Sequence, residues 1–177
     1  MRKGKEVAIL GLYVALLIGG QVALSTISGV EVVTILLLTF AYVFGIRRGL
    51  IVATAFSLLR CFIFGFFPNV IILYLIYYNL FVITIGGLRQ VFKGAVTPLK
   101  HVMIIALALI LTAIFTALDN VLTPLFYGLG REEWEAYATL SLTSLIPQLF
   151  CTLITVSLLF RPLFKVLVRV KSTALNK

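Results

Sequence analysis

Apolar residues fill six long runs of this chain, and short segments rich in charge, glycine or proline separate the runs. At a rise of about 1.5 Å per residue, roughly 20 apolar residues allow a helix to cross the hydrocarbon core of a bilayer, which is about 30 Å thick. The pattern therefore predicts an all-α membrane protein with six transmembrane helices. These helices are expected over residues 6–27, 32–44, 50–66, 69–88, 101–122 and 137–160.

Glycine and proline mark several boundaries between these runs. A tight turn is expected at residues 45–49, and Pro68 favours a helix start because proline has no amide hydrogen to lose. The second run is short for a span, so we expect it to lean on neighbouring helices or to lie where the protein is thin. The most polar loop is expected at residues 127–135, and Pro147 is expected to kink the sixth helix.

The composition favours a membrane-embedded chain over a soluble one. Of the 177 residues, 62% are hydrophobic and only 12% are charged, and the mean hydropathy is +1.16. No polar linker divides the chain, so residues 1–177 are interpreted as a single transmembrane domain. The basic start has the outline of a signal peptide, but the apolar run behind it is long for one and five more follow, so we expect a retained first helix.

The formal net charge of +9 is distributed as in a membrane protein rather than a nucleic-acid-binding protein. With a cytoplasmic N terminus and six crossings, every Lys and Arg except Arg60 and Arg131 falls within the cytoplasm. Most of the acidic residues fall outside. Because basic residues are retained on the cytoplasmic side of membranes, we expect both termini to be cytoplasmic.

A set of polar residues interrupts the apolar runs at one depth, in the predicted outer half of the bundle. Arg60 is the most informative, because a charge within the bilayer must face protein, water or a ligand. Tyr74 and Tyr78 share one helix face at i, i+4. We expect a cavity that opens to the outside. Its substrate-binding residues are predicted to be Arg60, Tyr74, Tyr78, Asn79, Gln21, Asp119, Asn120 and Gln148.

Each of these residues also has a structural interpretation. Arg60 could pair with Asp119 instead of, or in addition to, binding a ligand. The tyrosines could serve for packing, and Gln148 could satisfy the backbone groups that Pro147 frees. These alternatives stay open from the sequence.

Residue patterns typical of catalysis or of metal binding are missing from the sequence. It contains no HExxH, no GxxxxGK[ST] and no GxGxxG, the two cysteines form no CxxC, and His101 is the only histidine. We therefore expect no enzyme, no cofactor and no metal site, and any ATP hydrolysis would belong to a partner.

Small residues recur every four positions along the first predicted helix. Gly11, Ala15, Gly19 and Ala23 would form a smooth stripe on which another helix can approach closely. The stripe could contact a partner subunit, with Gly11 and Ala15 as the contact residues, or it could serve internal packing. It could also be split, with its inner end at Gly11 and Ala15 serving a partner and its outer end packing internally.

These features together resemble the substrate-binding S component of energy-coupling factor (ECF) transporters. Gly11-x-x-x-Ala15 is similar to the AxxxA motif of that family, and Phe44-Gly45-x-x-x-Gly49 is similar to its glycine-bounded turn. The resemblance implies a multi-pass protein of the bacterial plasma membrane that captures a vitamin or vitamin precursor from outside. It implies as partners a transmembrane coupling subunit, contacted by Gly11 and Ala15, and two ATP-binding-cassette ATPases. It also implies that the loop after the first helix, with residues 66–69 and 127–135, covers the pocket.

Two other classes of protein are alternatives. A small membrane scaffold or assembly protein without a transported ligand would use the stripe but would not need the outer polar cluster. A channel or autonomous transporter would carry polar residues through the inner half of the bundle as well. The polar set favours a planar heterocycle with an electron-rich group near Arg60, but it does not identify one ligand.

Overall fold

Helices make up nearly all of the computed structural model, which describes residues 2–27, 32–92, 94 and 96–175. The described part of the chain contains no strand. The all-helical prediction is thus confirmed for the described residues. α1, α5, α6 and α7 are each long and apolar enough to cross a membrane, which is consistent with a membrane protein. The helices are α1 (Arg2–Leu24), α2 (Val33–Phe44), α3 (Ile46–Leu59), α4 (Cys61–Phe64), α5 (Pro68–Val91), α6 (Pro98–Tyr127) and α7 (Arg131–Leu175).

The second and third apolar runs form helices that are shorter than a typical bilayer span. α2 has 12 residues and α3 has 14. The third run is divided at Arg60, which lies in a turn between α3 and the short helix α4. The count of six spans therefore stays a prediction, and so does the cytoplasmic placement of the termini.

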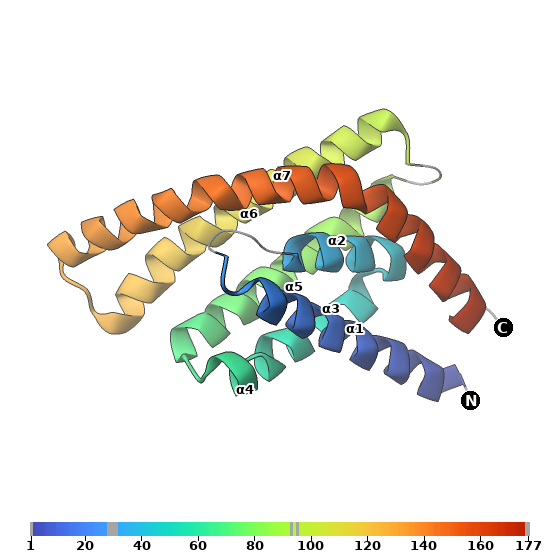
Figure 1. Cartoon of the computed structure of the whole chain (residues 1–177), viewed down its shortest axis with the longest axis horizontal. Helices are drawn as coiled ribbons and strands as arrows, with labels where there is room; N and C mark the ends of the chain where they lie inside the picture. Colours follow the sequence, from blue (N-terminus) through green and yellow to red (C-terminus); the bar gives the residue numbers. More distant parts are fainter. Residues whose placement is uncertain (1, 28–31, 93, 95, 176–177) are drawn as a thin grey trace.

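α2 is the most enclosed helix of the fold. Every residue of α2 except Leu36 is buried, and the helix packs against α3, α5 and α7. Figure 1 shows α2 lying between α7 and α1. The Phe40 ring packs against the rings of Tyr13 and Phe44, with centroids 4.4 and 4.5 Å away. Because protein surrounds α2, it does not need the length of a helix that faces lipid.

Glycines allow α3 and α5 to pack closely. A Cβ atom added at Gly86 would lie 2.5 Å from Ile46 Cγ1 and 3.2 Å from the Ile46 backbone nitrogen. A Cβ atom added at Gly49 would lie 2.5 Å from Val82 Cγ1. Any larger residue at either position would force the helices apart, so this contact fixes α5, the helix that carries Tyr74 and Tyr78.

α6 and α7 form a long hairpin whose connection is shorter than the sequence predicted. The polar loop expected at residues 127–135 comprises only residues 128–130. Gly128, at φ 63°, ends α6 in the left-handed conformation that glycine adopts without strain. The Gly130 amide donates to Glu133 Oε2 at 3.0 Å. Acidic residues at a helix start favour helix because they offset the positive end of its dipole, so this polar segment is helical.

α7 is one helix of 45 residues that contains Pro147 and Pro162. It continues well past residue 160, where the sixth span was predicted to end. Figure 1 shows its red C-terminal part turning away from its orange part. Proline removes a backbone hydrogen bond from a helix and bends it without ending it, and Pro162 lies in the C-terminal part.

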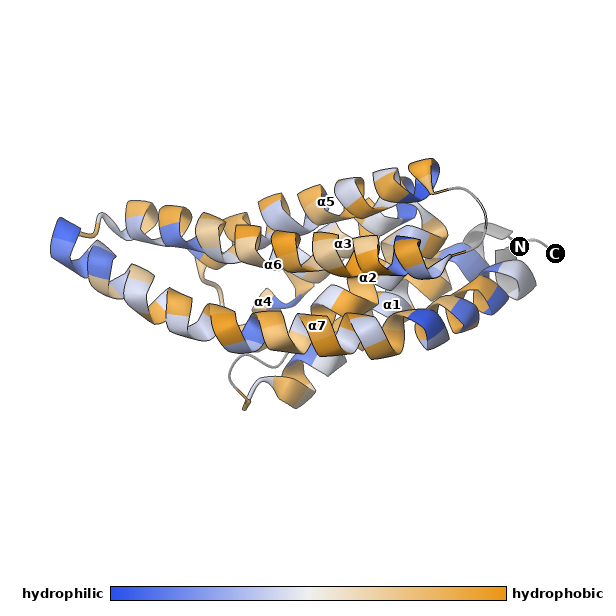
Figure 2. Cartoon of the chain, turned by 90° about the horizontal axis from the view of Figure 1, so that it is seen from above, coloured by the Kyte–Doolittle hydropathy of each residue, from blue (hydrophilic) through white to orange (hydrophobic). Residues whose placement is uncertain are grey.

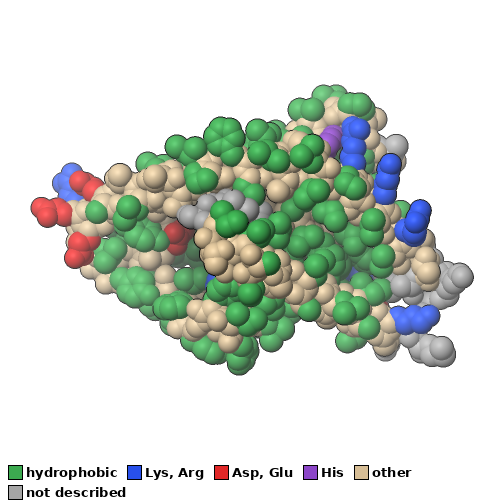
Figure 3. Space-filling view, in the orientation of Figure 1, with side chains coloured by type: hydrophobic (Ala, Val, Ile, Leu, Met, Phe, Trp, Pro, Cys, Tyr) green, Lys and Arg blue, Asp and Glu red, His purple; other side chains and the backbone are tan. Residues whose placement is uncertain are grey.

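Charge is separated along the long axis of the molecule. In Figure 3, acidic side chains gather at the tip of the α6–α7 hairpin and basic side chains at the opposite end, near both termini. Figure 2 shows mostly hydrophobic residues along the helices between these two ends. This distribution is typical of an apolar body with two water-exposed ends.

Candidate functional site

A partly open cavity of about 290 Å³ lies among α1, α2, α5, α6 and α7. Its volume is close to the lower end of the range for ligand pockets, roughly 300–1,000 Å³. Aromatic and aliphatic side chains form much of its wall, and amide and hydroxyl groups interrupt them. The polar and aromatic lining residues are Gln21, Ser25, Thr34, Phe64, Tyr74, Tyr77, Tyr78, Thr112, Phe115 and Gln148.

Four aromatic rings from α5 and α6 form one side of the cavity. The ring centroids of Tyr77 and Phe115 are 4.8 Å apart, and those of Tyr74 and Tyr78 are 5.0 Å apart with the rings nearly perpendicular. Such edge-to-face packing holds the rings rigidly. It gives the cavity a preformed aromatic wall against which a planar ligand could stack.

Arg60 lies behind this wall, in the turn between α3 and α4. Its side chain is 9% exposed, and its guanidinium carbon lies 4.2 Å from the Tyr74 ring centroid and 4.9 Å from that of Phe64. Arg60 Nε donates to Gln21 Oε1 at 3.3 Å, and Gln21 Nε2 donates to the Tyr74 hydroxyl at 3.3 Å. The guanidinium is thus joined to the cavity through Gln21 and Tyr74, two residues that line it.

Asp119 does not pair with Arg60 in the described part of the chain. The Asp119 carboxylate accepts hydrogen bonds from the Tyr137 hydroxyl at 2.6 Å and the Thr123 hydroxyl at 2.7 Å. It lines a neighbouring hollow of about 280 Å³ between α6 and α7, which shares Phe115 and Gln148 with the main cavity. Of the two interpretations left open for Arg60, the ion pair with Asp119 is therefore not formed.

The eight predicted substrate-binding residues thus occupy different places. Gln21, Tyr74, Tyr78 and Gln148 line the cavity, Arg60 lies directly behind it, and Asp119 lines the adjoining hollow.

Asn79 and Asn120 line neither space. Asn79 accepts a hydrogen bond from the Thr54 hydroxyl at 3.1 Å and donates to the Leu75 carbonyl at 2.8 Å, so it links α5 to α3. The Asn120 Oδ1 atom is buried without a hydrogen-bond partner among the described residues.

Several lining residues were not among those predicted. Phe115 and Thr112 come from α6, Thr34 from α2 and Phe64 from α4. On α6 a signal existed, because Thr112, Phe115 and Asp119 are spaced at i, i+3 and i+7 and so share a helix face. Phe64 and Thr34 gave no such signal, because their position depends on how the helices pack.

The small-residue stripe of α1 faces away from the rest of the protein. Gly11, Ala15, Gly19 and Ala23 are exposed, and a Cβ atom added at Gly11 or Gly19 would meet no atom within 4 Å. The opposite face of α1 makes the internal contacts. The stripe is therefore not used for packing within this chain.

The remaining chemistry of the described residues is sparse. They contain no group of three or more His, Cys, Asp or Glu side chains that could hold a metal ion. The segment 28–31, which was expected to cover the pocket, lies outside the described residues.

Comparisons with protein-family models, curated proteins and solved structures find no match for this chain. The functional argument therefore rests on the cavity and on the exposed face of α1.

Proposed function

We propose that this protein is the substrate-binding S component of an ECF-type importer in a bacterial plasma membrane. In this role it captures a vitamin or vitamin precursor from outside the cell. A transmembrane coupling subunit and two ATP-binding-cassette ATPases complete the importer and supply the energy. The observation that carries the proposal is the cavity with an aromatic wall, two amide side chains and an arginine held behind it.

The cavity favours a flat ligand with polar edges. Tyr77 and Phe115 offer ring surfaces for stacking, and Gln21 and Gln148 offer amide groups for hydrogen bonds. Arg60 donates only one hydrogen bond to a described residue, and its partner is a neutral amide. A guanidinium has five N–H groups, so it retains donors for a carboxylate or a similarly electron-rich group of the ligand.

The proposed orientation has six crossings, with α3 and α4 together forming one of them. Both ends of the described chain then lie in the cytoplasm, together with the basic end of the molecule, and the acidic tip lies outside. The excess of basic residues at the cytoplasmic end of a membrane protein supports this arrangement.

The exposed stripe on α1 supplies the proposed contact with the coupling subunit. Gly11 and Ala15 present almost no side chain, so the backbone of a second helix can come close. A scaffold protein could use the same face, so the stripe alone does not separate these two functions.

Native mass spectrometry of the protein purified in detergent from a bacterial membrane tests the proposal. We expect a bound small molecule that is lost in Arg60→Ala, because losing a hydrogen bond from a charged donor lowers affinity about tenfold or more. Arg131→Ala is the matched control, since Arg131 is exposed at the hairpin tip, and it should keep the bound mass.

A folded Arg60→Ala protein is recognised by an unchanged helical circular dichroism spectrum. If Arg60→Ala does not fold, Gln21→Ala gives the same test from the other side of the hydrogen bond. No bound mass, together with no thermal stabilisation by a panel of vitamins and their precursors, would favour the scaffold function instead.

A further inference from the structure

A second cavity, of about 360 Å³, lies beside the C-terminal end of α2. Tyr42 of α2, Arg89 of α5 and Lys171 of α7 bring polar groups to it, and Phe92 and Phe164 add aromatic walls. It shares no lining residue with the first cavity. Nothing in the proposed capture of a vitamin-like ligand uses it.

The two cations of this cavity share one uncharged partner. Arg89 Nη1 and Lys171 Nζ both donate to the carbonyl oxygen of Val43, the latter at 2.7 Å. The positive charges of Arg89 and Arg48 repel the positive charge of Lys171. A carbonyl at the end of a helix carries only a partial negative charge. It attracts the cations, but it does not neutralise them.

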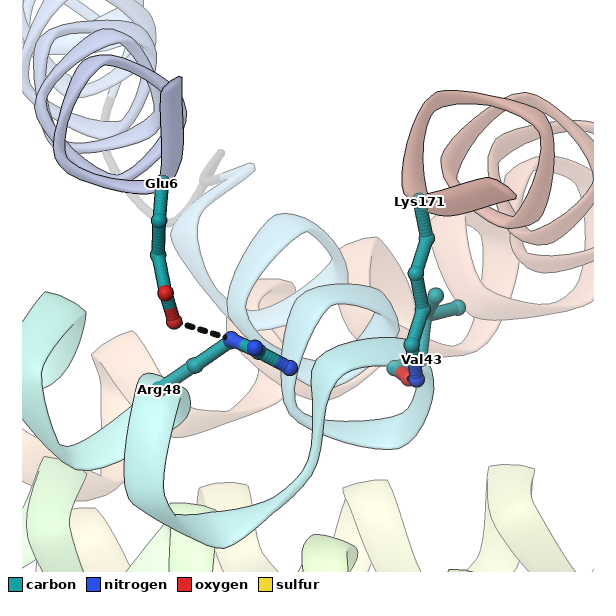
Figure 4. Close-up of polar contacts among 4 residues, drawn as sticks. All are labelled: Glu6, Val43, Arg48 and Lys171. Atoms are coloured by element: carbon teal, nitrogen blue, oxygen red, sulfur yellow. Dashed lines mark hydrogen bonds and ion pairs between the residues drawn. The ribbon is translucent and has the colours of Figure 1, made fainter. Parts of the chain in front are cut away.

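Among the described residues, one carboxylate forms an ion pair at this end of the molecule. Glu6 of α1 accepts a hydrogen bond from Arg48 at 2.6 Å. Figure 4 shows Glu6 coming from α1 on one side of Arg48 and Lys171 coming from α7 on the other. The sequence has no Asp or Glu between Glu31 and Asp119, or after Glu135, so α2, α3, α5 and the C-terminal part of α7 supply no further acid.

Lys100 Nζ lies 5.9 Å from the centroid of the Phe92 ring, which lines this cavity. The charges around the cavity are thus predominantly positive, with Glu6 engaged by Arg48.

The Tyr42 hydroxyl is an independent sign that a ligand group is accommodated here. Tyr42 is 3% exposed and lines the cavity, and its hydroxyl oxygen is buried without a hydrogen-bond partner among the described residues. A buried hydroxyl is unfavourable unless it forms a hydrogen bond. An anion held by Arg89 and Lys171 would provide the acceptor that the described protein groups do not.

We propose that this cavity binds a phosphate group, with Arg89, Lys171 and the Tyr42 hydroxyl as donors. Phosphate oxygens accept several hydrogen bonds and carry the negative charge that the cavity lacks. Two sources share this chemistry. One is the headgroup of an anionic phospholipid, which basic pockets between helices at the cytoplasmic side recognise, and the other is free inorganic phosphate.

The test uses the full chain in lipid nanodiscs and in detergent. In native mass spectrometry, retention of phosphatidylglycerol is compared with retention of phosphatidylcholine, whose choline group the cations repel. In phosphatidylcholine nanodiscs, the midpoint of thermal unfolding is compared in sodium phosphate and in sodium chloride at equal ionic strength.

Three variants are compared with the unsubstituted protein. Lys171→Gln removes a donor and should lower occupancy about tenfold. Tyr42→Phe removes only the unpartnered hydroxyl, so it should fold normally and lower occupancy about threefold to fivefold. Lys165→Gln makes the same charge change at an exposed position of α7, and it should leave occupancy unchanged.

Preference for phosphatidylglycerol assigns the site to a lipid headgroup, and stabilisation by phosphate assigns it to the free ion. Both effects together establish the shared chemistry. The proposal is overturned if neither effect appears, or if Lys171→Gln and Tyr42→Phe behave like Lys165→Gln. Loss of the vitamin-like ligand at the first cavity would leave this result unaffected, because the two cavities share no residue.

Discussion

At the scale of single residues, Arg60 is held by one amide and two aromatic faces. The Tyr74 and Phe64 rings stabilise its positive charge through cation–π contacts, each worth about 0.5–2 kcal/mol. None of these groups carries a negative charge, so they position the guanidinium without neutralising it. A carboxylate entering the cavity would therefore gain more from Arg60 than from an arginine already in an ion pair.

Asn79 links two helices and does not line the cavity, and this gives a prediction about stability. The hydrogen bond between Thr54 and Asn79 joins α3 to α5, and such bonds within membranes contribute about 0.6 kcal/mol on average. We expect Asn79→Leu to lower the free energy of unfolding by about that amount and to leave ligand affinity unchanged. A double-mutant cycle with Thr54→Val, followed by unfolding in mixed micelles, measures the coupling.

The result for Asn79 also bears on the site. A coupling energy near zero would show that the bond contributes nothing. A large fall in ligand affinity in Asn79→Leu would return Asn79 to the binding site.

The level of a polar residue along its helix is easier to predict from the sequence than the direction of its side chain. Depth follows from counting residues along a run, but direction depends on which neighbours surround the helix. Asn79 follows Tyr78 by one position, which is about 100° of helix rotation. This rotation turns Asn79 to α3, while Tyr78 lines the cavity. Phe115 by itself is one apolar residue among many, and only its spacing from Thr112 and Asp119 marks it.

At the scale of helices, the two adjacent glycines of α5, Gly86 and Gly87, have different surroundings, and only Gly86 lies in the contact with α3. A Cβ atom at Gly86 would clash with Ile46, whereas one at Gly87 would meet nothing within 4 Å. We expect Gly86→Ala to destabilise the fold by about 1–3 kcal/mol through overpacking. Thermal unfolding of the purified protein measures this effect.

Gly87→Ala is the control for that prediction. It adds the same methyl group one position further along α5. We expect it to leave stability unchanged or raise it by about 0.5–1 kcal/mol, because alanine favours helix over glycine. Equal destabilisation by both variants would mean that the close approach of the helices is not the cause.

Because the small-residue face of α1 is exposed, a substitution there should affect binding to a partner subunit without affecting the stability of this protein. Gly11→Leu adds a large side chain where no neighbour lies within 4 Å, so we expect the unfolding midpoint and ligand affinity to stay unchanged. If this face contacts the coupling subunit, the same change should weaken co-purification with that subunit about tenfold or more, because the helices could no longer approach closely.

Ala117→Leu serves as the control for the α1 face. Ala117 is a small, exposed residue of α6, and its enlargement tests whether any bulky surface change disturbs the complex. Equal co-purification of Gly11→Leu and the unsubstituted protein would exclude this face as the contact.

The sequence predicted the existence of the helices better than their ends. Long apolar runs leave few alternatives to helix within a bilayer. The ends depend on local capping that composition does not reveal. The segment at residues 127–135 is polar, yet a glycine cap and acidic residues at the start of α7 make most of it helical.

At the scale of the whole molecule, the separation of acidic and basic ends predicts the orientation. We expect a cysteine at position 133, at the hairpin tip, to react with a membrane-impermeant maleimide on intact cells. A cysteine at position 172, near the end of α7, should react only after the membrane is permeabilised. Both are introduced into a Cys61→Ala, Cys151→Ala background, whose lack of labelling is the control. The reverse labelling pattern would show that the protein has the opposite orientation in the membrane.

The burial of α2 has a consequence for how the protein is made. A helix of 12 residues is too short to be retained by a bilayer on its own. The three helices that it packs against most, α3, α5 and α7, are all synthesised after it. During translation, α2 is therefore left partly uncovered until these later helices have been made and have packed against it. Its native surroundings are complete only when α7 arrives, so a ribosome that stalls before α7 would leave an apolar helix open to quality-control proteases.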